Sequence, residues 1–340
     1  MKAVVLDKIG SLNNLRYTDI PIPEPDNNEM LIKVEYCGLN HLDLLIIEGK
    51  RLGPKTFPHI LGSEFIGIIV KINSKDRNFK IGDRVAVYPW TFCGKCEQCR
   101  RGNENICDNG GTFGRTRWGG FAEFVSVPVK NLVKIPSYLS SKLVSASVLS
   151  TITAYHMIKR ANIKNHATVL VTGATGGVGT SAAQLLKERK CKVICATNHN
   201  SKVKKLKELG TDEVVKTNNL INEVKNISSN GVDYVIDIMG GNVWSKGIEL
   251  LAKNGTMVFC STTLDDPGSV NLASAFSRQT NILGSYGGTV NDLREVIKLL
   301  QKDTIKPVID SIYPLEKTKE ALYKFDQQKA FGKILIKCSI

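Results

Sequence analysis

Four of the nine cysteines in this 340-residue chain lie close enough together in sequence to bind one metal ion. They are Cys93, Cys96, Cys99 and Cys107, in a C-x2-C-x2-C-x7-C pattern. Short gaps let one loop wrap an ion, and four thiolates complete the tetrahedral shell of zinc. A closed shell leaves no open position for substrate, so the spacing predicts a structural zinc. An iron-sulfur cluster uses similar ligands and is the alternative metal group.

A glycine-rich turn follows a short apolar stretch in the middle of the chain. The stretch 168–172 leads into Gly173, Gly176, Gly177 and Val178, and helix-compatible residues come next. Glycines let the backbone approach a pyrophosphate, which a helix N-terminus then binds through free amide hydrogens. The order of strand, turn and helix therefore predicts a dinucleotide site, although Ala174 departs from the G-x-G-x-x-G pattern. A tight turn that binds nothing is the alternative.

The end of the next apolar strand, 192–196, carries the residues expected to select the cofactor. An acidic residue there would accept hydrogen bonds from the adenosine ribose and repel a 2′-phosphate. The sequence instead has Thr197 and Asn198, with Lys202 shortly after. Neutral donors and a cation suit a phosphate monoester, so we expect NADP(H) in preference to NAD(H). Alternatively, Lys202 only begins a solvated basic helix face.

The elements that position these groups change character along the chain. Residues 1–126 contain short strands, such as 30–36 and 65–72, broken by prolines and glycines. From about residue 145, strands alternate with helices, which predicts a parallel sheet covered on both faces. The expected strands are 168–171, 192–196, 232–237, 256–260 and 333–337, and the expected helices are 178–189, 201–209, 244–251, 290–301 and 315–325.

Composition restricts the class of protein. Hydrophobic residues make up 42% of the chain and charged residues 23%, which excludes a disordered or collagen-like chain. The net charge of +14 is compatible with a nucleic-acid-binding protein. The lysines are spread along the chain, however, and aromatic residues are only 7%, which disfavours this function. Since neither a secretory signal nor an apolar stretch of 18 residues is visible, we expect a cytoplasmic protein.

These features together resemble the medium-chain dehydrogenase/reductase superfamily. The supporting stretches include Val34 to Asn40, Pro58 to Glu64 and Gly119 to Glu123. The resemblance implies an α/β chain with a GroES-like β-rich catalytic domain and a Rossmann doubly wound parallel-sheet cofactor domain. It places the catalytic domain at residues 1–126 with 286–340, and the NAD(P)-binding domain at 127–285. It also implies that the cysteine lobe holds a structural zinc.

Zinc alcohol dehydrogenases of this superfamily hold a second, catalytic zinc through a Cys, a His and a later Cys or Asp. The matching positions here are Asn40, Ser63 and, less securely aligned, Leu149. An amide and a hydroxyl do not replace a thiolate and an imidazole at such a zinc, so we expect no catalytic zinc. A metal held by His41 or Glu64 is the alternative.

The absence of those ligands redirects the expected chemistry. A simple alcohol needs a Lewis acid to stabilise its alkoxide, whereas a quinone or enone spreads the charge from hydride addition over its conjugated system. The segment from Asn40 to Asp43 resembles the Asn-x-x-Asp segment of quinone oxidoreductases and enone reductases. We expect Asn40 to orient a carbonyl and Asp43 to anchor the loop. Ser63 and Glu64 complete the candidate catalytic set, and Leu45 replaces a tyrosine that many relatives carry.

The resemblance also suggests residues near the nicotinamide ring and a mode of assembly. Thr153, Ser261 and Ser285 match positions near that ring, although each could equally be a packed polar residue. The sequence therefore predicts an NADP(H)-dependent reductase of a quinone or α,β-unsaturated carbonyl, assembled as a homodimer or homotetramer. The alternatives are an alcohol dehydrogenase or aldehyde reductase with an atypical site, and a single-stranded nucleic-acid-binding protein on a dehydrogenase fold.

Overall fold

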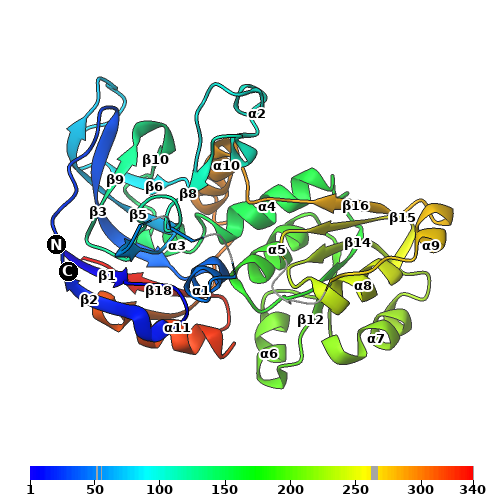
Figure 1. The fold of residues 1–340 in the computed structure, drawn as a ribbon. Coiled ribbons are helices and arrows are strands. Elements are labelled where there is room, and N and C mark those ends of the chain that lie inside the picture. The colour runs from blue at the N-terminus through cyan, green and yellow to red at the C-terminus, as the bar shows by residue number, and fades with distance from the viewer. Residues whose placement is uncertain (51–52, 55, 262–266, 340) are drawn as a thin grey trace. The chain divides into compact units, whose positions relative to one another are not determined.

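The computed structural model describes residues 1–50, 53–54, 56–261 and 267–339. The chain forms two compact units (Figure 1). The first comprises residues 1–149, 289–303 and 309–340, and the second comprises 150–288 and 304–308. Each unit has its own hydrophobic core, as expected for domains of this size.

The first unit is built on a seven-stranded, mostly antiparallel sheet. Its strands run in the order β10-β6-β5-β3-β18-β17, and β9 also pairs with β3. The bounds are β3 (Glu29–Gly38), β5 (Glu64–Asn73), β6 (Arg84–Val87), β9 (Phe124–Pro128), β10 (Leu132–Lys134), β17 (Ile309–Pro314) and β18 (Lys333–Lys337). β18 adds to β3 from the far end of the chain, with Leu335 opposite Gly38. This pairing brings segments nearly 300 residues apart in sequence into one sheet.

Smaller elements complete the first unit. A second sheet has the order β2-β1-β4, with β1 (Lys2–Leu6), β2 (Leu15–Asp19) and β4 (His59–Ile60), and β7 (Trp90–Thr91) pairs with β8 (Gly111–Thr112). The helices are α1 (His41–Ile47), α2 (Glu97–Arg100), α3 (Ser141–Ser145), α10 (Val290–Gln301) and α11 (Thr318–Asp326). Short 3-10 turns are η1 (Leu12–Asn14), η2 (Glu104–Ile106), η3 (Val129–Asn131) and η5 (Leu315–Lys317).

The second unit is a parallel six-stranded sheet with the order β13-β12-β11-β14-β15-β16. This is the doubly wound order, in which ligands bind at the carboxyl ends of the strands. The strands are β11 (Thr168–Val171), β12 (Lys192–Ala196), β13 (Glu213–Val215), β14 (Val232–Asp237), β15 (Leu251–Phe259) and β16 (Asn281–Gly284). The helices and one 3-10 turn are α4 (Ser150–Arg160), α5 (Gly177–Glu188), α6 (Asn200–Glu208), η4 (Thr217–Asn219), α7 (Leu220–Ile227), α8 (Gly241–Glu249) and α9 (Leu272–Ser277).

The unit boundaries differ from those inferred from the sequence. The first unit extends to Leu149 instead of ending at residue 126. The physical reason is strand pairing: β9 joins β3 and β10 joins β6, so the chain stays in the first sheet beyond residue 126. The return to the first unit occurs at Thr289 instead of 286, and residues 304–308 belong to the second unit.

No helix within the described ranges is both long and apolar enough to cross a membrane.

Candidate active site and zinc lobe

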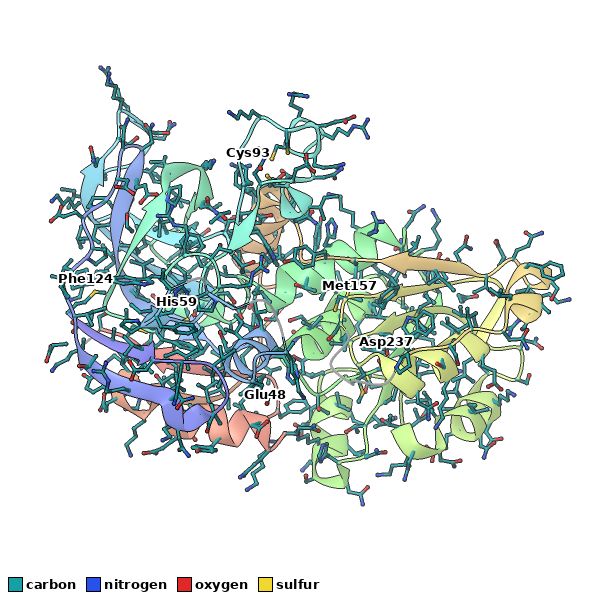
Figure 2. All side chains as sticks on the ribbon, in the orientation of Figure 1. Glu48, His59, Cys93, Phe124, Met157 and Asp237 are labelled. Atoms are coloured by element: carbon teal, nitrogen blue, oxygen red, sulfur yellow. The ribbon has the colours of Figure 1, made fainter. Side chains whose placement is uncertain are left out.

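The four predicted metal-binding cysteines converge in one lobe of the first unit. Their sulfur atoms all lie within 4.8 Å of one another, with Cys93 and Cys99 4.0 Å apart and Cys96 and Cys107 3.8 Å apart. Zinc bonded to four sulfurs at about 2.3 Å sets them about 3.8 Å apart, so this spacing fits a tetrahedral zinc. Figure 2 labels Cys93 in this lobe, where several sulfur atoms gather.

Backbone amides of the lobe prepare the sulfurs for a cation. The N–H groups of Lys95 and Cys96 donate to the Cys93 sulfur, which lowers the pKa of Cys93 to about 6. Burial raises the pKa of Cys99 to about 12. The Cys99 thiol therefore keeps its proton at neutral pH in the absence of a metal, and a dication in the lobe would supply the charge that favours its thiolate.

The four candidate catalytic residues lie at the start of two neighbouring elements of the first unit. Asn40 precedes α1, Asp43 lies in its first turn, and Ser63 and Glu64 lie where β5 begins. The register of β3 and β5 places Gly38 opposite Glu64, so the chain leaving β3 passes directly over that carboxylate. All four side chains are buried.

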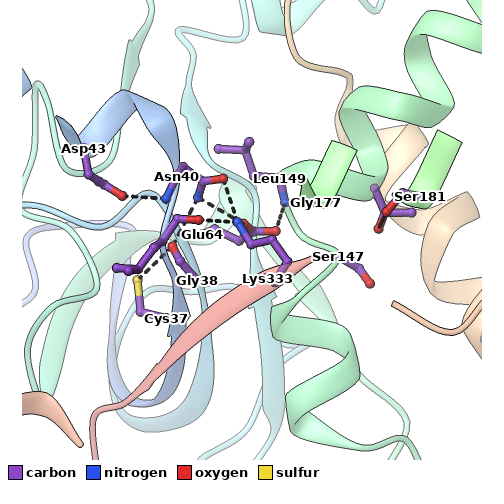
Figure 3. Close-up of polar contacts among 12 residues, drawn as sticks. Cys37, Gly38, Asn40, Asp43, Glu64, Ser147, Leu149, Gly177, Ser181 and Lys333 are labelled. Atoms are coloured by element: carbon purple, nitrogen blue, oxygen red, sulfur yellow. Dashed lines mark hydrogen bonds and ion pairs between the residues drawn. The ribbon is translucent and has the colours of Figure 1, made fainter. Parts of the chain in front are cut away.

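Lys333 contacts two of these four residues, Asn40 and Glu64. It was not identified as a site residue from the sequence. Its ammonium nitrogen lies 2.6 Å from Glu64 Oε2 and 2.8 Å from Asn40 Oδ1, and it also donates to the carbonyl of Leu39 (Figure 3). The side chains of Lys333 and Glu64 are only 5% and 0% exposed. Lysine is almost never buried without a partner, and here the partner is a buried carboxylate.

These contacts determine how the Asn40 amide is oriented. Lys333 only donates, so the atom that faces it must be the amide oxygen. The amide nitrogen then donates to Gly38 O at 3.1 Å and to Glu64 Oε2 at 3.0 Å. Both amide hydrogens are therefore engaged. The prediction that Asn40 donates to a substrate carbonyl requires one of these two bonds to open.

Asp43 is held by the backbone. Its two oxygens accept from the N–H groups of Asn40, at 2.8 Å, and Gly62, at 3.2 Å. Burial is the main cause that raises the pKa of Asp43 to about 7, against these hydrogen bonds. The geometry favours a loop-anchoring role, because both oxygens tie α1 to the segment before β5.

The possible metal ligands near this site do not form a second cluster. The His41 imidazole lies beside the ring of Phe325, with the ring centroids 6.3 Å apart. Among the described residues, the four-cysteine lobe is the only group of three or more His, Cys, Asp and Glu side chains close enough together to hold an ion. Ser63 Oγ is buried and has no hydrogen-bond partner in the described part of the chain.

The glycine-rich turn of the second unit has the geometry of an anion site. Gly173 has φ = +61°, and Gly176 is the N-cap of α5, where it has no side chain to cap the helix. A Cβ on Gly176 would meet only Gly173 O, at 3.7 Å, so the turn is open there. Gly177 and Val178 begin α5, whose amide groups point toward this opening.

The residues expected to select the cofactor follow β12. Thr197 is buried, Asn198 accepts from the Asn218 N–H at 3.1 Å, and Lys202 lies in α6 with 7% exposure. Because Lys202 is buried, it is not simply part of a solvated basic face. The structure adds Lys216, which follows β13 and donates to Asn200 at the start of α6. Strand order was needed to find it, since β13 lies beside β12 only in the folded sheet.

The three residues expected near the nicotinamide lie in the second unit. Thr153 is buried in α4, and Ser261 and Ser285 follow β15 and β16. The carboxyl ends of these parallel strands are the ligand-binding edge of such a sheet. Ser285 Oγ is buried without a hydrogen-bond partner among the described residues, so it can accept or donate one bond to a ligand.

Comparison with known proteins agrees with this architecture. Residues 26–137 match the alcohol dehydrogenase GroES-like domain model, and residues 177–302 match the zinc-binding dehydrogenase model. An NAD-dependent alcohol dehydrogenase of Sulfolobus acidocaldarius is 30% identical, with 99% of each chain covered. The chain belongs to the zinc-type medium-chain dehydrogenase/reductase superfamily. It is therefore a nicotinamide-dependent oxidoreductase with the GroES-like and Rossmann domains of that superfamily.

Two further members show the range of this superfamily. An acryloyl-coenzyme A reductase of Sulfurisphaera tokodaii is 31% identical over 99% of this chain and 100% of its own length. A crystal structure of an NAD-dependent alcohol dehydrogenase superimposes with a TM-score of 0.95 at 30% identity, covering 100% of both chains. The superfamily thus includes alcohol dehydrogenases and a conjugated-thioester reductase at similar distances from this chain.

Proposed function

We propose that this protein is an NADP(H)-dependent reductase of quinones or α,β-unsaturated carbonyl compounds that works without a catalytic zinc. The observation that carries the proposal is the buried network of Asn40, Glu64 and Lys333, in which Asn40 occupies a position that the resemblance matches to a catalytic zinc ligand. The nearby Ser63 and Leu149 offer no thiolate or imidazole. The name of the acryloyl-coenzyme A reductase supports the substrate class, since an acryloyl thioester is a conjugated carbonyl.

The chemistry follows from the groups available. The nicotinamide supplies hydride to the substrate. Addition to a conjugated acceptor develops negative charge that spreads onto an oxygen, so hydrogen-bond donors can stabilise it without a Lewis acid. Asn40 and Ser63 are the candidate donors, Glu64 holds the Asn40 amide, and Asp43 anchors the turn that carries it. The four-cysteine lobe would hold one structural zinc per subunit. Its four protein ligands would leave no position for substrate, so this zinc would take no part in hydride transfer.

The cofactor preference rests on charge. The segment after β12 has no acidic side chain from Thr197 to Lys202, while Lys202 and Lys216 bring positive charge to the start of α6. A 2′-phosphate gains from those cations. The alcohol dehydrogenases named above are NAD-dependent, so direct comparison is required. The variant Lys216→Gln should weaken NADPH binding about tenfold, equivalent to about 1.4 kcal/mol, and leave NADH binding unchanged. Lys225→Gln, on α7, is the control.

A spectrophotometric panel tests the reaction itself. NADPH and NADH are each tried with quinones, enones, enoyl thioesters, aldehydes and alcohols, before and after mild chelation. We expect NADPH oxidation with conjugated acceptors that survives chelation, and no turnover with simple alcohols. Asn40→Ala should lower kcat. Chelator-sensitive alcohol oxidation, with two tightly held zinc ions per subunit, would instead establish the second candidate, an alcohol dehydrogenase, which the relatives' names favour.

A further inference from the structure

Lys333 has the surroundings of a bound cation. Three oxygens from three different groups face its nitrogen: the Glu64 carboxylate, the Asn40 amide and the Leu39 carbonyl. An ammonium has three hydrogens, so these acceptors saturate it. A carboxylate, an amide oxygen and a backbone carbonyl are also the ligand types that hard divalent cations prefer.

The backbone around the pair leaves room for it. A Cβ on Gly38 would lie 3.0 Å from Glu64 Oε2 and 3.2 Å from Lys333 Cε. A side chain at position 38 would therefore press on both partners. Because Gly38 has no side chain, β3 can pass close to the ion pair of Glu64 and Lys333. The neighbouring strand β18 supplies the lysine.

The second oxygen of Glu64 is also occupied. Glu64 Oε1 accepts from the Leu149 N–H at 2.7 Å (Figure 3). The carboxylate thus joins Lys333 and Asn40 to the segment at position 149, the third position matched to a catalytic zinc ligand. Glu64 and Lys333 thus connect two of the three matched positions, Asn40 and Leu149, while the Ser63 hydroxyl stays outside this network.

We propose that the Lys333 ammonium takes the place of a metal cation at this site: it positions Asn40 and Glu64 and prevents a divalent cation from binding there. The inference rests on the proposed metal-free reductase, and adds that the missing metal has been replaced by a fixed charge of the protein. Lys333 acts as a positioning residue, because all three of its hydrogens are engaged by the protein.

The consequence is that removing the lysine should create a metal site. In Lys333→Ala, the Glu64 carboxylate, the Asn40 oxygen and the Leu39 carbonyl lose their cation and face a space that it vacated. Oxygen ligands of this kind suit Mn²⁺, which does not compete well for the four thiolates. We expect Lys333→Ala to bind about one Mn²⁺ per chain, measured by electron paramagnetic resonance titration, and the wild-type protein to bind none at this affinity.

Paired variants separate this effect from misfolding. Glu64→Gln/Lys333→Ala lacks the carboxylate and should not bind Mn²⁺, while Mn²⁺ should raise the melting temperature of Lys333→Ala alone. Lys333→Met removes the charge while filling much of the space. It should lower kcat about 10–100-fold, the size of effect known for residues that orient metal ligands, with little change in the KM for NADPH. Lys337→Met, on the exposed end of the same strand, should behave as wild type.

Two results would overturn the inference. One is Mn²⁺ binding by the wild-type protein equal to that of Lys333→Ala. The other is no Mn²⁺ binding by Lys333→Ala when its circular dichroism and its structural zinc content match wild type. Neither result depends on enzymatic turnover. Failure of the substrate panel would therefore refute the proposed function without deciding the role of Lys333, and the titration would decide that role alone.

Discussion

Asp43 shows how burial changes the properties of a single carboxyl group. It is 1% exposed, and burial raises its pKa from 3.8 to about 7 despite two backbone donors. Between those two values the folded chain keeps a proton that the unfolded chain releases. The folded state therefore binds more protons in this window, and the contribution of Asp43 to stability decreases as the pH rises through it.

Comparison with Asp43→Asn isolates this contribution, because asparagine does not titrate. We expect the free energy of unfolding of the wild type, minus that of Asp43→Asn, to fall between about pH 4 and pH 7. The fall is at most about 4 kcal/mol, from about 1.4 kcal/mol per pKa unit. Urea unfolding at several pH values measures it. A difference that stays constant or rises with pH would contradict the assignment.

At the scale of the element, two glycines of the glycine-rich turn have different roles: Gly179 permits close packing, and Gly176 keeps the turn open. A Cβ on Gly179 would lie 2.4 Å from Gly173 O and 2.5 Å from Ala174 Cα, so its absence permits close packing of the helix on the turn. Gly176 has no such neighbour. We expect Gly179→Ala to cost about 1–3 kcal/mol of stability. Gly176→Ala should instead keep the melting temperature and weaken NADPH binding, as measured by fluorescence titration. Equal melting temperatures for both variants would refute this distinction.

The zinc lobe makes a second prediction at this scale. Cys99→Ser should lose the bound zinc, measured by elemental analysis, while Cys191→Ala should keep it. Loss of the ion frees the loop around α2, so trypsin should cut faster at the exposed Arg100 and Arg101. A local destabilisation of about 1.4 kcal/mol raises the cleavage rate tenfold. Unchanged cleavage in a zinc-free variant would show that the lobe is held by other contacts, such as that of Glu104 with Val290 N.

Elements set by local sequence patterns could be predicted at this scale, whereas the pairing of strands far apart in the sequence could not. The strands Thr168–Val171 and Lys192–Ala196 have the residues expected from periodicity, and the four cysteines converge because they are close in sequence. Lys333 was predicted only as the first residue of a strand. Its role depends on the pairing of β18 with β3, which no local pattern specifies. The first unit extends past the inferred boundary at residue 126 for the same reason, since β10 pairs with β6 of the first sheet.

At the scale of the whole molecule, the second unit exposes large apolar side chains on α9 and on the edge strand β16. On α9, Leu272 and Phe276 are 74% and 78% exposed, and the edge strand β16 adds Ile282 at 38%. We infer that this surface is covered in a homo-oligomer, as proposed from the resemblance, because an exposed sheet edge with apolar residues favours association.

The variant Leu272→Ser/Phe276→Ser should reduce the mass measured by light scattering to that of a smaller assembly or a monomer. Tyr138→Ser is the matched control, since Tyr138 is 71% exposed but lies in the first unit. The prediction fails if the wild type is already monomeric, or if both variants keep the wild-type mass.

The insertion of β18 beside β3 also determines when the site can form during synthesis. Lys333 and Asn40 are 293 residues apart, and the second unit is translated between them. Glu64 therefore has no ammonium partner until the ribosome has synthesised the second unit and reached Lys333. Domains generally fold as units during translation, so the continuous part of the second unit can fold before the first is finished. The catalytic domain is begun first and completed last.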